Sequence, residues 1–361
     1  MPQSHRERIK PARSRTFVRV TFEDSNKVYS APVGATIEDF FAVARPELVP
    51  PVRQPDHSTE KTVVAAICNG ALRELTYPIE TDSTVKPITL CSTDGVRIYQ
   101  RSLAFILRTA AHNLFGDTKL ALNHDLPFGA LYGTVTNGPP LTLEQIGLLK
   151  TAVQTLIDND LPIKRAEVPL KEAIAVFKAQ QDDDMLRLLE SREKDYVTLY
   201  TLGDVQDYFF GYMIPSTSYI TLWDIEPTEG GFLLRYPRPD TATVLKKVSD
   251  VSKLQSLFTE NAKLLDLLEV NDIGDLNQST HYGRARELIL VTEALHEGRI
   301  VDIAEKIVNH QPDIRLVLIA GPSCSGKTSF SKRLAVQLMA HEYKPFTRGM
   351  DNYFLGPDQT P

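Results

Sequence analysis

Cysteine is scarce in this sequence. Three cysteines, Cys68, Cys91 and Cys324, occur in 361 residues. Their number is odd and they lie far apart, so they have neither the pairing expected of a disulfide framework nor the close spacing of metal ligands. We therefore expect free thiols.

Long apolar runs are missing as well. No stretch approaches the roughly 20 consecutive apolar residues that span a bilayer. Residues 1–15 are basic and polar, and no apolar segment of the kind found in a signal peptide follows them. We expect a flexible tail over residues 1–15 and a cytoplasmic protein with no membrane partner. No internal repeat or low-complexity segment occurs.

An excess of positive charge is also absent. The chain has 40 Lys and Arg residues against 46 Asp and Glu residues, a formal net charge of −6. This balance disfavours broad coating of nucleic acid, so RNA is a partner only if one local face is basic. The hydrophobic content of 42% is that of a globular protein, and the length predicts two to four domains with an oligomeric state that the sequence leaves open.

Residues 16–91 are predicted to form a β-grasp-like domain. Alternating apolar residues indicate strands over residues 17–22 and 28–29, and further strands over residues 62–67, 72–75 and 85–90. A helical stretch begins at residues 36–41. The dipeptides Asn69-Gly70 and Asp82-Ser83 mark turns between strands, and Asp94-Gly95 is predicted to close the domain.

The next two regions are predicted to be an α+β domain over residues 92–240 and a helical connector over residues 241–310. Helices are predicted over residues 102–114, 143–158, 170–180 and 185–191, and strands over residues 196–202, 219–225 and 231–236. In the connector the predicted helices cover residues 253–268, 284–296 and 300–309.

A phosphate-binding loop follows the connector. The segment has the pattern of two glycines separated by four residues and followed by lysine and threonine, which lets backbone amides approach a polyphosphate at a helix N-terminus. The candidate nucleotide-binding residues are Gly321, Ser323, Cys324, Ser325, Gly326, Lys327, Thr328 and Ser329. Pro322 has no amide hydrogen, so the cradle of donors begins at Ser323.

The flanking sequence favours a real nucleotide site over a chance match. An apolar run over residues 314–320 predicts a parallel strand before the loop, and residues 329–341 predict a helix after it. Lys327 is the candidate catalytic cation for the outer phosphates, and the hydroxyl of Thr328 is the candidate ligand of Mg²⁺. A second predicted strand, residues 344–350, places Asp351 at its end, either as a catalytic group or as a turn cap.

Residues 317–361 resemble the uridine kinase and phosphoribulokinase family through this loop and through Met350-Asp351-Asn352-Tyr353-Phe354. The resemblance implies ATP and Mg²⁺ as cofactors and a nucleoside or similar small molecule as acceptor. It also implies that Asp351 is the catalytic base, whereas Tyr353 and Phe354 pack or line the substrate site. Since the sequence stops soon after this motif, residues 311–361 are expected to be the N-terminal part of an α/β P-loop kinase domain with a parallel sheet, inactive by itself.

The two leading domains resemble other proteins. Residues 16–91 are similar to the TGS domain through the segments 66–70 and 72–75, and residues 99–236 resemble the editing domain of threonyl-tRNA synthetases through the segments 101–105, 114–115 and 211–217. The synthetase domain carries a His-x-x-x-His pair and a Cys-x-x-x-His pair. The aligned positions in this chain are Arg101 and Phe105, and Phe209 and Met213. We therefore predict no zinc site and no hydrolytic chemistry in this domain.

The order of these regions resembles a group of bacterial nucleoside kinases. The predicted function is ATP-dependent phosphoryl transfer to a uridine-like nucleoside, with the editing-like domain as a binding or regulatory module. Two alternatives are a nucleotide-dependent RNA- or ribosome-binding regulator and a TGS-containing GTPase. The guanine-specific Asn-Lys-x-Asp segment of a GTPase does not occur in the sequence.

Overall fold

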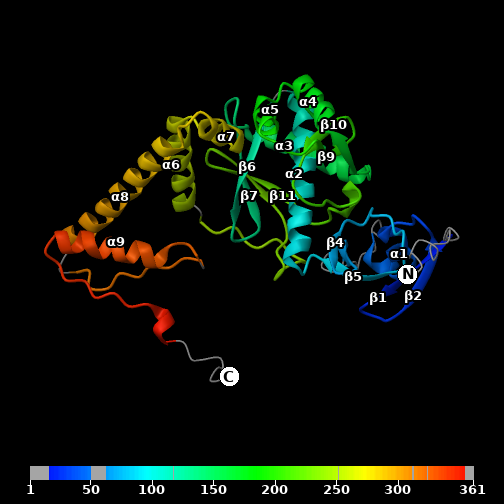
Figure 1. Ribbon diagram of the computed structural model, residues 1–361, viewed down its shortest axis with the longest axis horizontal. Coiled ribbons are helices and arrows are strands. Elements are labelled where there is room, and N and C mark those ends of the chain that lie inside the picture. Colours follow the sequence, from blue (N-terminus) through cyan, green and yellow to red (C-terminus); the bar gives the residue numbers. More distant parts are fainter. Residues whose placement is uncertain are drawn as a thin grey trace, which may run out of the picture. The chain divides into compact units, whose positions relative to one another are not determined.

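The structure is a computed structural model that describes residues 16–49, 62–116, 118–250, 252–310, 313–322 and 324–353. The chain divides into two compact units, residues 1–183 with 192–256 and residues 184–191 with 257–361, and each is described by itself. Figure 1 labels their elements. The predicted tail over residues 1–15 lies outside the described residues, and the finer division into four domains stays a prediction.

The first unit begins with a mixed five-stranded sheet. Its strands, in sheet order, are β2 (Val28–Pro32), β1 (Phe17–Phe22), β5 (Ser83–Thr89), β3 (Val63–Cys68) and β4 (Ala71–Arg73). The neighbours β1 and β5 are parallel, and the other pairs are antiparallel. The strands predicted in this region are thus present and belong to one mixed sheet.

Local sequence signals fix two features of this sheet. Helix α1 (Ile37–Ala44) begins with a capping box, in which the Thr36 side chain accepts from the Asp39 amide and the Asp39 carboxylate accepts from the Thr36 amide. Asn69 and Gly70 join β3 to β4 with φ angles of 50° and 78°, so the predicted turn is confirmed.

Helix α2 (Thr93–Phe115) begins well before the predicted start at Ser102. Asp94 and Gly95 were predicted to close the first domain ahead of the helix, but they lie in the first turn of this helix, where the Ser92 hydroxyl accepts from the Gly95 amide at 3.0 Å. A Cβ atom on Gly95 would stand 2.0 Å from the carbonyl oxygen of Thr89. The glycine therefore permits close approach of two backbones instead of a turn.

Two antiparallel sheets complete the first unit. The four-stranded sheet contains β11 (Asp224–Thr228), β12 (Gly231–Arg235), β7 (Ala130–Val135) and β6 (Leu120–Leu126), and the three-stranded sheet contains β10 (Val205–Tyr208), β9 (Tyr196–Leu202) and β8 (Lys164–Pro169). The helices beside them are α3 (Leu143–Asp158), α4 (Leu170–Ala179) and the 3-10 helix η4 (Thr217–Tyr219). The α+β class is confirmed, although the strand predicted over residues 219–225 begins only at Asp224.

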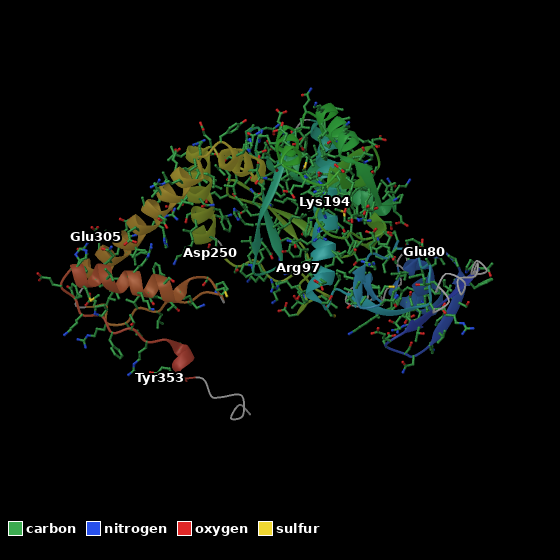
Figure 2. The ribbon with its side chains drawn as sticks, in the orientation of Figure 1. Glu80, Arg97, Lys194, Asp250, Glu305 and Tyr353 are labelled. Atoms are coloured by element: carbon green, nitrogen blue, oxygen red, sulfur yellow. The ribbon has the colours of Figure 1, made fainter. Side chains whose placement is uncertain are left out.

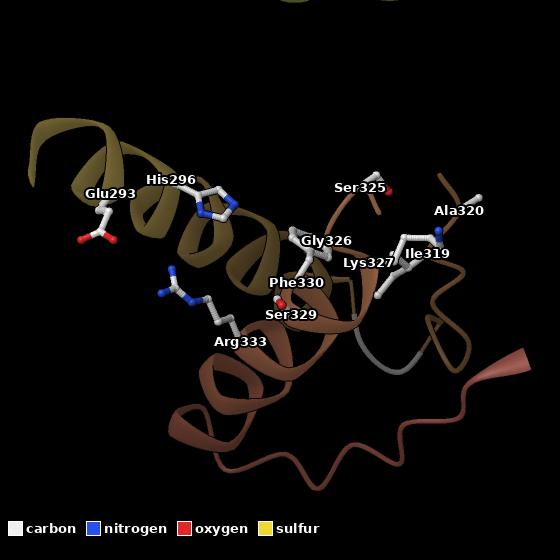
Figure 3. A pocket seen from close by; sticks show the side chains of 10 residues that line it. All are labelled: Glu293, His296, Ile319, Ala320, Ser325, Gly326, Lys327, Ser329, Phe330 and Arg333. Carbon is white, nitrogen blue, oxygen red and sulfur yellow. The ribbon is translucent and has the colours of Figure 1, made fainter. Parts of the chain in front are cut away.

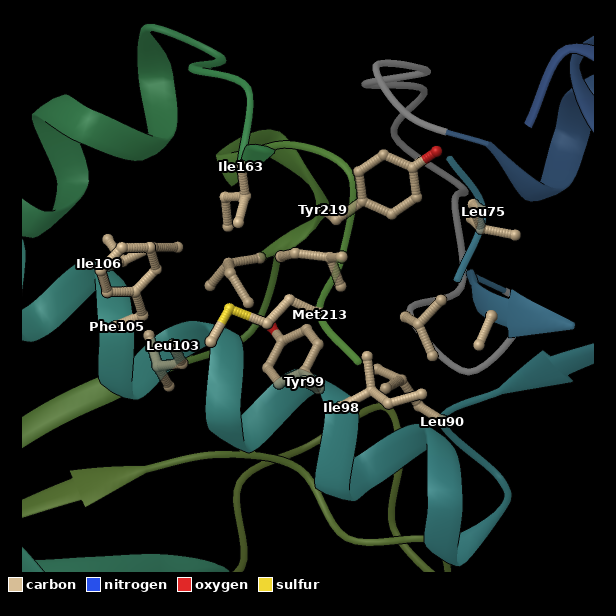
Figure 4. Close-up of a cluster of buried hydrophobic side chains, with 14 of the residues drawn as sticks. Leu75, Leu90, Ile98, Tyr99, Leu103, Phe105, Ile106, Ile163, Met213 and Tyr219 are labelled. Carbon is tan, nitrogen blue, oxygen red and sulfur yellow. The ribbon is translucent and has the colours of Figure 1, made fainter. Parts of the chain in front are cut away.

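Helix α2 is the centre of one hydrophobic core. Its buried side chains belong to the same cluster as the apolar residues of the five-stranded sheet, α3 and the four-stranded sheet. Figure 4 shows Tyr99, Leu103 and Phe105 along this helix, and Met213 and Tyr219 belong to the same buried cluster. The Tyr99 hydroxyl is itself bonded to the backbone, because it donates to the Leu222 carbonyl at 3.0 Å and accepts from the Leu222 amide at 2.8 Å. The β-grasp-like region and the α+β region thus share a core.

A half-buried carboxyl, that of Glu38, joins these two regions and is expected to make the stability depend on pH. The Tyr219 hydroxyl donates to Oε1 of Glu38 at 2.5 Å. Burial raises the pKa of the Glu38 carboxyl above its ordinary value of 4.5, and the Tyr219 hydrogen bond opposes this shift in part. The folded protein therefore takes up this proton at a higher pH than the unfolded chain does, so Glu38 adds to stability as the pH falls from neutral toward 4.5.

Glu38→Gln is expected to remove this contribution. The free energy of unfolding, measured by urea denaturation between pH 7 and pH 5, should gain less on acidification in the variant than in the wild-type protein. Glu80→Gln is the matched control, since Glu80 is exposed in the same region (Figure 2). Equal pH slopes for Glu38→Gln and wild type would contradict the prediction.

The second unit is built around helices. Its elements are α5 (Asp183–Glu190) from Asp184 on, α6 (Ser252–Leu268) from Leu257 on, α7 (Ile273–His281), α8 (Ala285–Asn309), α9 (Lys327–Ala340) and the 3-10 helix η5 (Met350–Tyr353). Arg187 of α5 lies 2.8 Å from a carboxylate oxygen of Asp272 and 2.9 Å from one of Asp275, which ties α5 to the start of α7. Helices α8 and α9 share a small core of Ile300, Ala304, Leu334 and Leu338. None of the helices in the described part of the chain has both the length and the apolar composition needed to cross a membrane.

Four predicted elements of this unit, two helices and two strands, differ from the structure. Residues 284–296 and 300–309 form one continuous helix, α8, because the glycine between them, Gly298, weakens a helix by only about 1 kcal/mol relative to alanine. The strands predicted over residues 314–320 and 344–350 are wrong, since the first has no regular structure and the second joins η5 at Met350. A parallel strand needs a hydrogen-bonded neighbour, and no strand pairs with either segment within the described residues.

Candidate functional site

The positions aligned with the synthetase His and Cys pairs lie where α2 meets residues 209–214. Ser102 of α2 joins the two segments, because its hydroxyl accepts from the Ile214 amide at 3.1 Å. The Phe105 ring is fully buried and its centroid lies 5.3 Å from that of Phe209, while Met213 is 2% exposed. Figure 4 shows Phe105 and Met213 among packed apolar side chains. Three of the four aligned positions therefore form part of the core.

Arg101 takes the fourth aligned position. Its guanidinium donates to the carbonyl oxygen of Tyr212, and it lies so close to Gly211 that a Cβ there would stand 2.7 Å from the guanidinium carbon. Burial lowers the pKa of Arg101, and Arg97 on the same helix lowers it further. An arginine in this setting remains a cation that binds anions and does not accept protons.

One polar pair at this place was missed from the sequence. Arg108 of α2 lies 2.7 Å from Oδ2 of Asp207, and the Asp207 side chain is only 6% exposed. Burial raises the pKa of the Asp207 carboxyl, and Arg108 opposes that shift. Since Asp207 lies on β10, a strand that the sequence did not predict, the pairing could not be read from the residues alone.

The predicted phosphate loop lies in the second unit. Gly326 has a φ of 82° and Cys324 a φ of 59°, which turn the chain into α9 at Lys327. The Lys327 ammonium donates to the carbonyl oxygens of Gly321 and Pro322 at 2.8 and 2.6 Å, so it lies across the mouth of the loop. Ser323 lies outside the described residues.

An open pocket of about 530 Å³ adjoins this loop (Figure 3). Ser325, Gly326, Lys327 and Ser329 line it together with Glu293 and His296 of α8 and Arg333 of α9. The Thr328 side chain is exposed in the first turn of α9, so its hydroxyl is accessible to a cation that also binds phosphate oxygens. Among the described residues no group of three or more His, Cys, Asp or Glu side chains is placed to hold a metal ion.

Asp351 does not lie at the end of a strand, the position that the sequence predicted for it. Its backbone lies in η5 instead of at the end of a strand, and its side chain is not among those described. Tyr353 is 57% exposed, and its hydroxyl accepts from Arg348 of the same segment. Phe354 lies outside the described residues.

Three known proteins to which this chain is similar are threonine–tRNA ligases. The chain is 28% identical to the threonine–tRNA ligase of Lawsonia intracellularis over 173 residues, 48% of this chain and 27% of that ligase. It is 33% identical to the threonine–tRNA ligase of Petrotoga mobilis over 174 residues, 48% of this chain and 27% of that ligase. The match to the ligase of a Geobacter species is 27% identical over 215 residues, 60% of this chain and 32% of that ligase. No family model matches the chain.

These relatives support an editing-like, threonyl-tRNA-synthetase-related region and contradict the predicted nucleoside kinase. They are tRNA ligases, and they give no better support to the RNA-binding regulator or the GTPase. The chain spans less than a third of the length of the three ligases described. What those whole enzymes do therefore does not transfer directly to this chain.

Proposed function

We propose that the first unit binds the acceptor end of a tRNA and does not hydrolyse the aminoacyl ester. The proposal is supported by the similarity to threonine–tRNA ligases over about half of the chain. It also fits the α+β architecture of the first unit, in which a β-grasp-like sheet and an editing-like region share one core.

The observation that carries the proposal is the packing of Phe105 and Met213. An ester hydrolase needs a group that activates water and space for that water. Neither side chain has a basic atom, both are buried away from solvent, and Phe209 packs on Phe105. Arg101 remains at the edge as a cation, which favours binding of an anionic ligand over proton transfer.

Incubation of the purified chain with mischarged tRNA tests this function. We expect tRNA binding, an ester half-life equal to that in buffer, and no stoichiometric zinc by elemental analysis. A tRNA lacking its terminal CCA should bind more weakly, because the acceptor end is the proposed ligand. Ester hydrolysis above the buffer rate, stoichiometric zinc, or equal binding of the shortened tRNA would each contradict the proposal.

A second candidate function is nucleotide binding by residues 321–329, and the position of Lys327 favours it. The ammonium lies over two loop carbonyls, and the loop opens onto the N-terminus of α9, where backbone amides favour an anion. ATP would be held by the loop amides and Lys327, and Mg²⁺ by the Thr328 hydroxyl and the phosphate oxygens. When bound, Mg²⁺ would neutralise phosphate charge.

A further inference from the structure

Three arginines from different elements meet at Tyr212 in the first unit. Arg101 of α2 donates to the Tyr212 carbonyl, and Arg73 of β4 donates to the Tyr212 hydroxyl at 3.3 Å. The guanidinium carbon of Arg165 on β8 lies 6.0 Å from the centroid of the Tyr212 ring. One tyrosine thus contacts three cationic side chains that lie far apart in the sequence.

The arginine cluster, defined as Arg73, Arg101 and Arg165, has too few carboxylates to balance it. Glu74 is the nearby buried carboxylate, at 9% exposed, and burial raises its pKa while Arg165 opposes the shift. Within the described part of the chain, neither Arg73 nor Arg101 forms an ion pair, whereas Arg165 lies 3.3 Å from the exposed Glu167. An exposed pair of that kind is screened by water and neutralises little of the charge.

The backbone at Gly211 leaves room for the guanidinium of Arg101. Gly211 has a φ of 110°, which favours glycine, and a side chain there would collide with the guanidinium of Arg101. The Gly211 carbonyl accepts from the Tyr200 hydroxyl at 2.9 Å, and the same hydroxyl lies 3.3 Å from Oε2 of Glu74. Tyr200, Tyr212 and Gly211 therefore position the buried carboxylate Glu74 and the cation Arg101.

The net charge of the arginine cluster and Glu74 indicates which ligand the cluster binds. Three guanidinium charges less the charge of the buried Glu74 leave two positive charges, because the exposed Glu167 is screened by water; a phosphate monoester dianion balances them and a carboxylate does not. Guanidinium groups donate two parallel hydrogen bonds to phosphate oxygens, and their mutual repulsion in a half-buried site falls when an anion lies between them.

We propose that Arg73, Arg101 and Arg165 bind a phosphate monoester. The phosphate comes either from a free small molecule or from the 5′ end of an RNA. Only the RNA source rests on the proposed tRNA-binding function.

The experiment uses the full chain carrying Lys327→Ala, so that the loop of the second unit does not contribute. Calorimetric titration with inorganic phosphate at constant ionic strength should give saturable binding at one site per chain. Arg165→Gln should weaken it about tenfold or more, as expected for loss of a charge-assisted hydrogen bond. Arg101→Gln should have the same effect, and Arg19→Gln, which changes an exposed arginine of β1, should have none.

Two RNAs of the same sequence, one with a 5′-phosphate and one with a 5′-hydroxyl, separate the sources. Tighter binding of the phosphorylated RNA that disappears in Arg165→Gln supports the RNA end as ligand. Equal binding of both RNAs together with saturable phosphate binding supports a free phosphate ester. The proposal is overturned by unsaturable phosphate binding with no RNA discrimination, or by equal affinities in Arg165→Gln, Arg101→Gln and Arg19→Gln. Loss of all tRNA binding with intact phosphate binding would remove the proposed function and leave this site standing.

Discussion

Lys327→Ala is expected to weaken ATP binding by on the order of 10²-fold, because it removes a charge-assisted contact to the outer phosphates. In the structure the ammonium lies 2.8 and 2.6 Å from the carbonyl oxygens of Gly321 and Pro322, at the mouth of the loop. A phosphate group entering the loop would replace these carbonyls as its partner. Titration of the purified chain with ATP in the presence of Mg²⁺ gives the dissociation constant.

Lys332→Ala is the matched control for this prediction. Lys332 lies on the same helix, α9, and is exposed, so its removal changes the net charge by the same amount without touching the loop. Its effect on ATP affinity should stay within about twofold, since exposed charges outside a site contribute little. If Lys327→Ala and Lys332→Ala bind ATP equally well, the loop is not the nucleotide site.

Short-range signals made much of the fold predictable. The alternation in β1, the Asn69-Gly70 turn and the helix α3 depend on residues close in sequence, and each appears in the structure. Strands β6, β7, β8 and β10 were missed. β7 pairs with β12 about a hundred residues further along, in the register Leu131↔Leu234, and β8 is an exposed edge strand without an alternating apolar pattern. Long-range pairing decides such strands, and local pattern does not.

Before and after the phosphate loop the error was the opposite one: strands were predicted where the structure has none. Residues 314–320 are apolar enough for a buried strand, yet Leu316 and Leu318 are 75% and 82% exposed. The loop and α9 depend on local glycines and a helix terminus, so they form without a sheet. A strand depends on its neighbours, and the sequence pattern alone does not supply them.

Of the candidate sites, one could be predicted from the sequence and one could not. The four positions Arg101, Phe105, Phe209 and Met213 could be named from the sequence, and the structure places them where α2 meets residues 209–214. The arginine cluster could not, because its members lie on β4, α2 and β8 and meet only through the tertiary fold. The kinase function was wrong because a phosphate loop specifies which group is bound, and the same loop serves many reactions.

Phe105→Ala is expected to lower the free energy of unfolding by about 3 to 5 kcal/mol, the usual loss when a buried phenylalanine is truncated. The Phe105 ring is fully buried and packs on Phe209 with centroids 5.3 Å apart. A double-mutant cycle with Phe209→Ala should give a coupling of about 0.5 to 1.5 kcal/mol for the aromatic pair. Urea denaturation of the two single variants and the double variant measures both quantities.

Phe210→Ala is the control, because Phe210 follows Phe209 directly and is 88% exposed. Its free energy of unfolding should change by no more than about 0.5 kcal/mol. A small loss in Phe105→Ala, equal to that in Phe210→Ala, would mean that Phe105 lines an open cavity and does not fill a core. A water molecule and an ester could then enter where the synthetases carry their histidines, and burial of Phe105 would not keep this unit from hydrolysing the ester it binds.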